Sequence, residues 1–315
     1  METAILSPSI NTFGGHDDGM SIQGASHKKT DKPCQDYGGH YRCADYAVAV
    51  VCDGHGGDPY FRSDRGSTYG VEVVLNAIYE FMQGKAAFLK KLYSTDNDII
   101  KEELSSQAIQ QLIKNIIYCW SERVRNDLYE NPFTEDELKD LPDKYLIKYG
   151  TEGINDKFSA YGTTLIAIIY APEFWFGIRI GDGRCVSISK DGSIEDPIPW
   201  NEKCFLNTTV SLCDEKAFEN FRYCFHTDNF PVAIYVGTDG VDDSFGVYGN
   251  DERLFNFYRN LTRTFDLSGF DGGKKELAEY LPVLTEKGSG DDISISGILD
   301  LEGIKELFNT NPSKE

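Results

Sequence analysis

Apolar residues along this chain gather in short, nearly continuous runs that are separated by polar turns. Runs of this kind, rich in Val, Ile and aromatic residues, are typical of strands that are buried on both faces. The pattern therefore predicts that strands build the centre of the fold. The runs cover residues 46–52, 162–170, 174–180, 185–189, 233–237 and 293–299.

Two further segments place apolar residues at helical spacing. Stripes of this kind predict two helices that lie side by side on a sheet. The stripes are Val71, Val74, Leu75, Ile78 and Met82 in the first segment and Ile109, Leu112, Ile113, Ile116, Trp120 and Val124 in the second. Shorter helical patterns return at residues 254–261 and 277–281.

The order of these elements indicates the fold class. Short turns between neighbouring strands, such as the one at Asp191-Gly192, favour antiparallel pairing. We therefore expect an α+β fold with antiparallel sheets and outer helices, rather than a βαβ nucleotide-binding fold. A short strand at residues 20–26, a basic turn at 27–33 and a Gly38-Gly39 turn precede the strand at 46–52. The strands at 20–26 and 46–52 would form a pair that brings Asp36 and Asp53 to the same end of a sheet.

The remaining segments carry weaker patterns, and we assign them more coarsely within one domain that spans residues 1–315. Residues 1–19 are predicted to form an edge strand or a loose arm. Residues 129–157, with their prolines, are predicted to be a connector or insertion. Residues 194–230 are expected to form an irregular, flap-like segment over a site, and residues 301–315 a polar C-terminal tail.

Composition narrows the classes of partner. The net charge is −20, from 51 acidic against 31 basic residues, which disfavours nucleic acid and anionic membranes as partners. No apolar run approaches the roughly 20 residues that span a bilayer, and the polar N-terminus does not resemble a signal peptide. The eight cysteines are scattered without a Cys-x-x-Cys pair, so we expect a reducing cytoplasm and no structural zinc.

Several carboxylates share one local context, at the end or start of an apolar strand and beside glycine. They are Asp53, Asp182, Asp239 and Asp291, with Asp36 as a fifth candidate. Mg²⁺ and Mn²⁺ take oxygen ligands, and separate strand ends can hold such ligands rigidly. Asp-Gly at a strand end is also ordinary turn chemistry, so both interpretations stay open at this point.

Five motifs, in order, carry a family resemblance. They are Asp53-Gly54-His55-Gly56-Gly57, Tyr161-Gly162-Thr163-Thr164, Gly181-Asp182-Gly183-Arg184, Thr238-Asp239-Gly240 and Asp291-Asp292-Ile293-Ser294. In this order the chain resembles the metal-dependent Ser/Thr protein phosphatases of the type 2C family. Ser26-His27 and Pro33-Cys34-Gln35-Asp36 resemble its bacterial branch. The resemblance implies a four-layer α-β-β-α sandwich, in which helix pairs flank two antiparallel sheets.

The resemblance also implies a site with two Mn²⁺ or Mg²⁺ ions and a third, weaker one. Asp53 would bridge both ions, the Gly54 carbonyl would bind the second, and Asp239 and Asp291 the first. Asp36 would act through bound water, and Asp182 and Asp243 match the third position. A water bridging the two ions would attack phosphorus, and His55 would protonate the leaving alkoxide as general acid.

Three positions depart from the family pattern. Asp31 stands where many members carry an Arg that grips the substrate phosphate, so Lys28, Lys29 or Lys32 would have to substitute. Gln35 stands where many members have Glu, and Asp292 where the eukaryotic branch often has Asn. The role of His27 stays open, with capping or pairing near the basic turn as the simpler one.

These features lead to one main hypothesis and two alternatives. The main one is a monomeric, cytoplasmic phosphatase that hydrolyses phosphoserine and phosphothreonine in proteins. The first alternative is a catalytically weak relative that binds a partner or phosphoprotein as a scaffold or regulator. The second keeps the chemistry and changes the substrate to a small phosphate ester, phosphohistidine or phosphoarginine.

Overall fold

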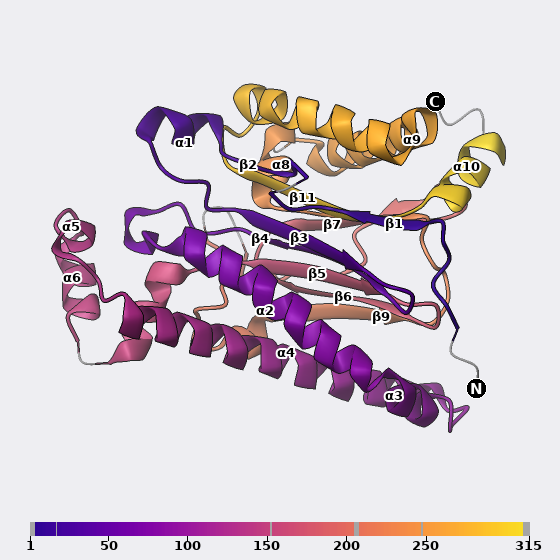
Figure 1. The fold of residues 1–315 in the computed structure, drawn as a ribbon, viewed down its shortest axis with the longest axis horizontal. Helices are drawn as coiled ribbons and strands as arrows, with labels where there is room; N and C mark the ends of the chain where they lie inside the picture. The colour runs from indigo at the N-terminus through magenta and orange to yellow at the C-terminus, as the bar shows by residue number, and fades with distance from the viewer. Residues whose placement is uncertain (1–3, 17, 152, 205–207, 247, 311–315) are drawn as a thin grey trace.

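The computed structural model describes residues 4–16, 18–151, 153–204, 208–246 and 248–310. Within these ranges the chain forms two antiparallel β-sheets that are stacked face to face, with helices covering both outer faces (Figure 1). The four-layer α+β sandwich expected from the sequence is therefore confirmed.

The first sheet has the strand order β3-β4-β5-β6-β9 in the described part of the chain. Each strand pairs with its neighbours in antiparallel register. The strands are β3 (Tyr37–Arg42), β4 (Ala47–Cys52), β5 (Leu165–Tyr170), β6 (Trp175–Ile180) and β9 (Arg222–His226).

The second sheet has the order β1-β11-β10-β7-β8, and β2 also pairs with β11. Its pairs are antiparallel too, and the β7–β8 connection confirms the hairpin predicted at Asp191-Gly192. The strands are β1 (Ile10–Phe13), β2 (Ser21–Ile22), β7 (Arg184–Ile188), β8 (Ile194–Glu195), β10 (Ala233–Gly237) and β11 (Ile293–Asp300).

A pair of long helices covers each sheet. Helices α2 (Ser63–Gln83) and α4 (Asp98–Glu130) lie on the first sheet, and α3 (Lys85–Leu92) joins them. Helix α9 (Asn250–Lys287) covers the second sheet and breaks at Gly269, where φ is 71°. Its two halves fold back on each other, since the Phe257 and Tyr280 rings stack at 6.0 Å. Helix α10 (Leu301–Thr310) packs against α9 near this break, where the Arg263 guanidinium lies over the Phe308 ring at 4.7 Å.

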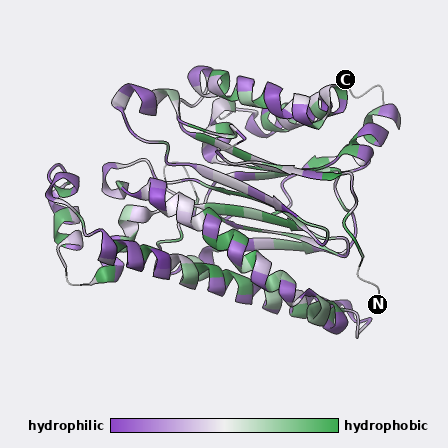
Figure 2. Ribbon diagram, in the orientation of Figure 1, coloured by the Kyte–Doolittle hydropathy of each residue, from purple (hydrophilic) through white to green (hydrophobic). Residues whose placement is uncertain are grey.

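Alternation along the strands assigns side chains to the layers. In β4, Ala47, Ala49 and Val51 face the second sheet, whereas Val48 and Val50 face α2 and α4. Figure 2 shows the central strands largely in hydrophobic colours, while the outer helices alternate between hydrophobic and hydrophilic residues. The strands are apolar on both faces because each sheet lies between two other layers.

Short helices complete the chain. They are α1 (Ala25–Thr30), α5 (Glu135–Leu138), α6 (Asp143–Tyr149), α7 (Ala217–Asn220) and α8 (Asp239–Asp242), with the 3₁₀ helices η1 (Asp58–Tyr60), η2 (Ile154–Tyr161) and η3 (Asp243–Phe245). No helix in the described ranges is long and apolar enough to cross a membrane.

Four local predictions were wrong. Gly38-Gly39 is not a turn but part of β3, and the basic turn at 27–33 begins as helix α1. The segment at 194–230 is not irregular throughout, because β9 completes the first sheet there. The polar tail at 301–315 is helix α10 up to Thr310, where Ile304 and Leu307 are buried against the core; residues 311–315 lie outside the described ranges.

Candidate functional site

Antiparallel register brings the strand-end carboxylates to one edge of the sandwich. Tyr37 pairs with Cys52, so Asp36 before β3 lies next to Asp53 after β4. In the other sheet, Gly237 pairs with Ile295, which places Asp239 after β10 near Asp291 before β11. These ends surround a cleft of about 370 Å³. It is lined by Asp53, Gly54, His55, Gly56, Gly57, Tyr60, Asp182, Thr208, Thr209, Asp239 and Asp291.

Three carboxylates of this cleft stand close enough to share a cation. Asp53, Asp182 and Asp239 each offer an oxygen, and these oxygens lie within 4.8 Å of one another. Asp182 reaches the cleft from the turn between β6 and β7, where Gly181 takes a φ of 113°. That φ favours glycine, which explains the Gly-Asp sequence at this corner.

The Thr163-Thr164 pair holds the Asp53 backbone. The Asp53 carbonyl accepts hydrogen bonds from the Thr163 hydroxyl and the Thr164 amide, both at 2.8 Å. The Asp53 amide donates to the Thr164 hydroxyl at 3.2 Å. These bonds give the second motif a physical role, since they fix the angle at which Asp53 leaves β4.

Gly54 sits where no side chain fits. A Cβ at this position would lie 2.5 Å from the Gln35 carbonyl oxygen and 2.7 Å from that of Ser63. The Gly54 amide donates to the same Gln35 carbonyl at 3.1 Å. The backbone after β4 can therefore approach the Gln35 and Ser63 carbonyls this closely only if residue 54 is glycine.

Four carboxylates at the cleft, Asp36, Asp53, Asp182 and Asp239, have raised pKa values. Burial, and next the charge of Asp182, raise the pKa of Asp239 to about 7. Burial, and then neighbouring carboxylates, raise the pKa of Asp53 well above its usual range, and burial also raises those of Asp36 and Asp182. Buried like charges at short range oppose ionisation unless a cation compensates them.

The donor set fits divalent cations. None of the described residues that line the cleft is Lys or Arg, so no side chain there offsets the negative charge. The buried oxygens Asp36 Oδ2 and Asp182 Oδ1 have no hydrogen-bond partner among the described residues. Converging carboxylate oxygens without partners are the ligands that Mg²⁺ and Mn²⁺ prefer.

Two predicted metal ligands differ from the rest in exposure. The Asp291 side chain is 52% exposed, although it lines the cleft. Asp243 is exposed in η3 and is not part of the lining, and burial followed by the charge of Asp291 raises its pKa. Asp243 therefore lies at the periphery of the site.

His55 stands at the wall of the cleft. Its ring packs edge-on against Tyr60 at 4.8 Å, and a Cβ on Gly162 would lie 2.5 Å from its Cδ2 atom. Its amide donates to the Gly162 carbonyl at 3.1 Å. Burial lowers the pKa of His55 to about 4, so the imidazole is neutral near pH 7.

The three candidate lysines occupy different places. Lys32 reaches the rim of the cleft, where its Nζ donates to the Gly56 carbonyl at 3.0 Å and lies 3.7 Å from Asp58. Lys28 and Lys29 are exposed on α1. Asp31, at the family's Arg position, is exposed at the end of α1 with a φ of 56°.

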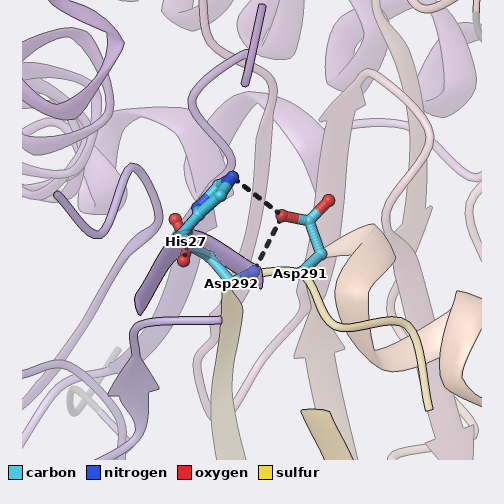
Figure 3. Close-up of side chains that lie close together, drawn as sticks. All are labelled: His27, Asp291 and Asp292. Atoms are coloured by element: carbon cyan, nitrogen blue, oxygen red, sulfur yellow. Dashed lines mark hydrogen bonds and ion pairs between the residues drawn. The ribbon is translucent and has the colours of Figure 1, made fainter. Parts of the chain in front are cut away.

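Asp292 is more important than the sequence indicated. It is 2% exposed and accepts hydrogen bonds from the Gly24 amide and the Gln35 amide, both at 2.6 Å, and from His27 Nδ1 at 2.9 Å. In the sequence it stands out only as an acidic residue directly before a buried strand. Figure 3 shows His27 and Asp291 beside it.

Thr208 and Thr209 were not predicted as site residues. Both line the cleft, and they belong to the 194–230 segment that was expected to cover a site. Residues 205–207 of that segment lie outside the described ranges. Threonine alone gives no sequence signal for such a role.

The fold and the site together define an α-β-β-α sandwich with an acidic cleft between its two sheets. A family model described as protein phosphatase 2C matches residues 23–282. The chain therefore belongs to the protein phosphatase 2C family, as its motifs indicated. A search of curated protein sequences returned no match to this chain.

Solved structures share the fold at low sequence identity. The serine/threonine phosphatase Stp1 from Staphylococcus aureus is 16% identical with a TM-score of 0.51, over 95% of this chain and 97% of that one. The catalytic domain of PstP, solved with two manganese ions, is 13% identical with a TM-score of 0.52, over 92% and 98%. A Caenorhabditis elegans (C.elegans) sex determining protein is 12% identical with a TM-score of 0.53, over 95% and 67%.

Proposed function

We propose that this protein is a metal-dependent phosphatase that hydrolyses phosphoserine and phosphothreonine in proteins. The observation that carries the proposal is the convergence of carboxylates from separate strand ends on a cleft without Lys or Arg in its described lining. Membership in the protein phosphatase 2C family supports the same reaction.

The proposed ligand roles follow the family motifs. Asp53 would hold both of two ions, the Gly54 carbonyl would be a further ligand of the second, and Asp239 and Asp291 would hold the first. Asp36 would act through bound water, and Asp182 with Asp243 would hold a third, weaker ion. When bound, Mn²⁺ or Mg²⁺ would lower the pKa of a water in the cleft and offset charge on the phosphoryl oxygens.

The chain's own groups handle the proton and the phosphate. We assign His55 to protonation of the leaving serine or threonine oxygen. Its neutral ring must first gain a proton, and the negative charge of a phosphate ester in the cleft would raise the pKa of His55. Lys32, at the rim beside Gly56, is the best placed of the three lysines to meet the phosphate.

The partner and setting belong to the same proposal. The substrate is a phosphorylated protein, and the enzyme acts as a monomer in the cytoplasm. All eight cysteines, which lie in the described ranges, are free thiols, and this supports a reducing compartment.

A release assay tests the proposal. Phosphate release from a phosphothreonine peptide is expected with Mn²⁺, to stop with a chelator, and to fall at least about a hundredfold in Asp53→Asn, because the shared ligand is lost. The matched control is Asp45→Asn, at the other end of β4, which should keep wild-type activity.

Three other outcomes would change the assignment. No release with either cation would contradict the proposal. Peptide binding without release would favour the scaffold alternative. The third outcome is faster turnover of a small phosphate ester or a phosphohistidine peptide than of phosphoserine and phosphothreonine peptides. It would assign a different substrate class to the same metal-dependent hydrolysis.

A further inference from the structure

His27 is held at the site by a hydrogen bond to a residue near the other end of the sequence. Its Nδ1 lies 2.9 Å from Asp292 Oδ1, although 265 residues separate the two in sequence. Asp292 is itself fixed by the Gly24 and Gln35 amides, so its carboxylate has one orientation. A carboxylate that accepts from Nδ1 keeps the proton there and leaves Nε2 with a free lone pair.

The free nitrogen of His27 points toward Asp291 (Figure 3). Nε2 lies 3.7 Å from Asp291 Oδ1, which is too long for a hydrogen bond. Two ligands about 2.1 Å from one ion stand roughly 3.0–3.4 Å apart in octahedral or tetrahedral geometry, so small side-chain rotations suffice. His27, Asp291 and Asp292 together form a group whose ligand atoms lie within 4.8 Å of one another.

Gln35 provides a second observation at the same place. Its Oε1 is buried and has no hydrogen-bond partner among the described residues, and the residue is only 6% exposed. A Cβ built on Gly56 would lie 3.7 Å from this oxygen and 3.8 Å from His27 Nε2. An imidazole nitrogen and a partnerless amide oxygen thus face the same space beside Gly56.

We propose that His27 Nε2 ligates the divalent cation held by Asp291, with Asp292 orienting the imidazole through Nδ1. The inference rests on the proposed function only in that Asp291 is taken as a metal ligand. It adds a nitrogen donor to a site for which the family resemblance implied oxygen ligands alone. Mg²⁺ keeps to oxygen ligands and water, whereas the affinity of a nitrogen-containing site rises from Mn²⁺ through Co²⁺ toward Zn²⁺, so His27 would shift the metal preference of this chain away from Mg²⁺ and toward those ions.

Pulsed electron paramagnetic resonance of the Mn²⁺-loaded protein tests the ligand directly. Wild type should show ¹⁴N coupling from a coordinated imidazole, and His27→Asn should lose it. Asparagine is the variant chosen because its amide can replace Nδ1 as donor to Asp292 and keep helix α1 in place. His55→Gln and His40→Gln, which alter two other histidines, should retain the coupling.

Affinity gives a second readout. Calorimetry should show Mn²⁺ binding weakened about tenfold or more in His27→Asn, with Mg²⁺ binding changed less than about threefold. No ¹⁴N coupling in wild type, or coupling that persists in His27→Asn, would overturn the inference. Neither measurement needs turnover, so a nitrogen-ligated but inactive protein would refute the proposed function alone, and an active protein without the coupling would refute this inference alone.

Discussion

Removing one of the site's carboxylates should stabilise the metal-free protein. Burial, and next the charge of Asp182, raise the pKa of Asp239 from its usual value of 3.8 to about 7. The folded state therefore holds a proton that the unfolded state has lost, and this stabilisation is full below pH 3.8 and disappears as the pH rises through 7. Raising the pKa from 3.8 to about 7 corresponds to about 4 kcal/mol over that whole pH range.

Asp239→Asn removes this pH-dependent contribution to stability and keeps the shape of the side chain. Between pH 5 and pH 8 the wild type loses about 2.6 kcal/mol through Asp239, so the variant should gain that much relative to it. His55, whose depressed pKa makes stability rise between pH 4 and 6.5, is present in both proteins and cancels in the difference. For 315 residues, with an unfolding entropy of about 0.66 kcal/mol/K, the relative gain is roughly 4 °C in Tm.

The assay is thermal or urea unfolding with a chelator at pH 5 and pH 8, repeated with Mn²⁺. Wild type should gain about 2.7 kcal/mol at a cation concentration of 100 times Kd, and Asp239→Asn should gain much less. Asp45→Asn, at the opposite end of β4, should follow the wild type at both pH values. If Asp239→Asn shows the same pH dependence as wild type, or if Mn²⁺ stabilises both equally, the electrostatic account of the cleft is refuted.

Three further predictions concern neighbouring features. Gly54→Ala should lower the free energy of unfolding by about 2 kcal/mol or more and weaken Mn²⁺ binding in calorimetry, because the added Cβ would meet two carbonyl oxygens. The control Gly249→Ala has nothing within 4 Å of its Cβ, so it should cost only about 1 kcal/mol, for the φ of 66°. Arg62→Ala should cost about 3–5 kcal/mol of stability in urea unfolding, since Glu137 and Tyr161 lose a buried partner. Arg123→Ala, at an exposed pair with Glu72, should change stability by less than about 1 kcal/mol, and equal losses in the two variants would contradict this ranking. Lys32→Ala should raise KM for a phosphopeptide about fivefold with kcat nearly unchanged. Lys29→Ala, on the exposed face of α1, should leave KM as it is. A larger rise in KM for Lys29→Ala than for Lys32→Ala would assign the phosphate contact to α1.

Much of the molecule follows from local patterns in the sequence. Continuous apolar runs predicted β4, β5, β6, β10 and β11, because strands between two layers need apolar residues on both faces. Helical spacing predicted α2 and α4. The candidate carboxylates could be chosen because a charged residue directly beside a buried strand, next to glycine, is a local signal.

Other features could not be predicted because they depend on contacts between distant segments. Gly38 and Gly39 looked like a turn, but both are strand residues of β3. Helix α2 crosses closely over Gly39, where a Cβ would lie 2.6 Å from Val71 Cγ1, and a Cβ on Gly38 would lie 3.1 Å from the Ser296 hydroxyl of the other sheet. Strand β9 lacks an apolar run because it forms the edge of its sheet, where its residues are only half-buried.

The site itself shows the same division. The sequence by itself determined which residue types stand at the strand ends, and with them the metal-binding chemistry that the chain can offer. Only the tertiary structure decided which of them meet: register brings Asp53, Asp182 and Asp239 within 4.8 Å, leaves Asp243 at the periphery, and joins His27 to Asp292. The physical reason is that antiparallel pairing and sheet stacking set distances between residues far apart in the chain, and no local pattern encodes those distances.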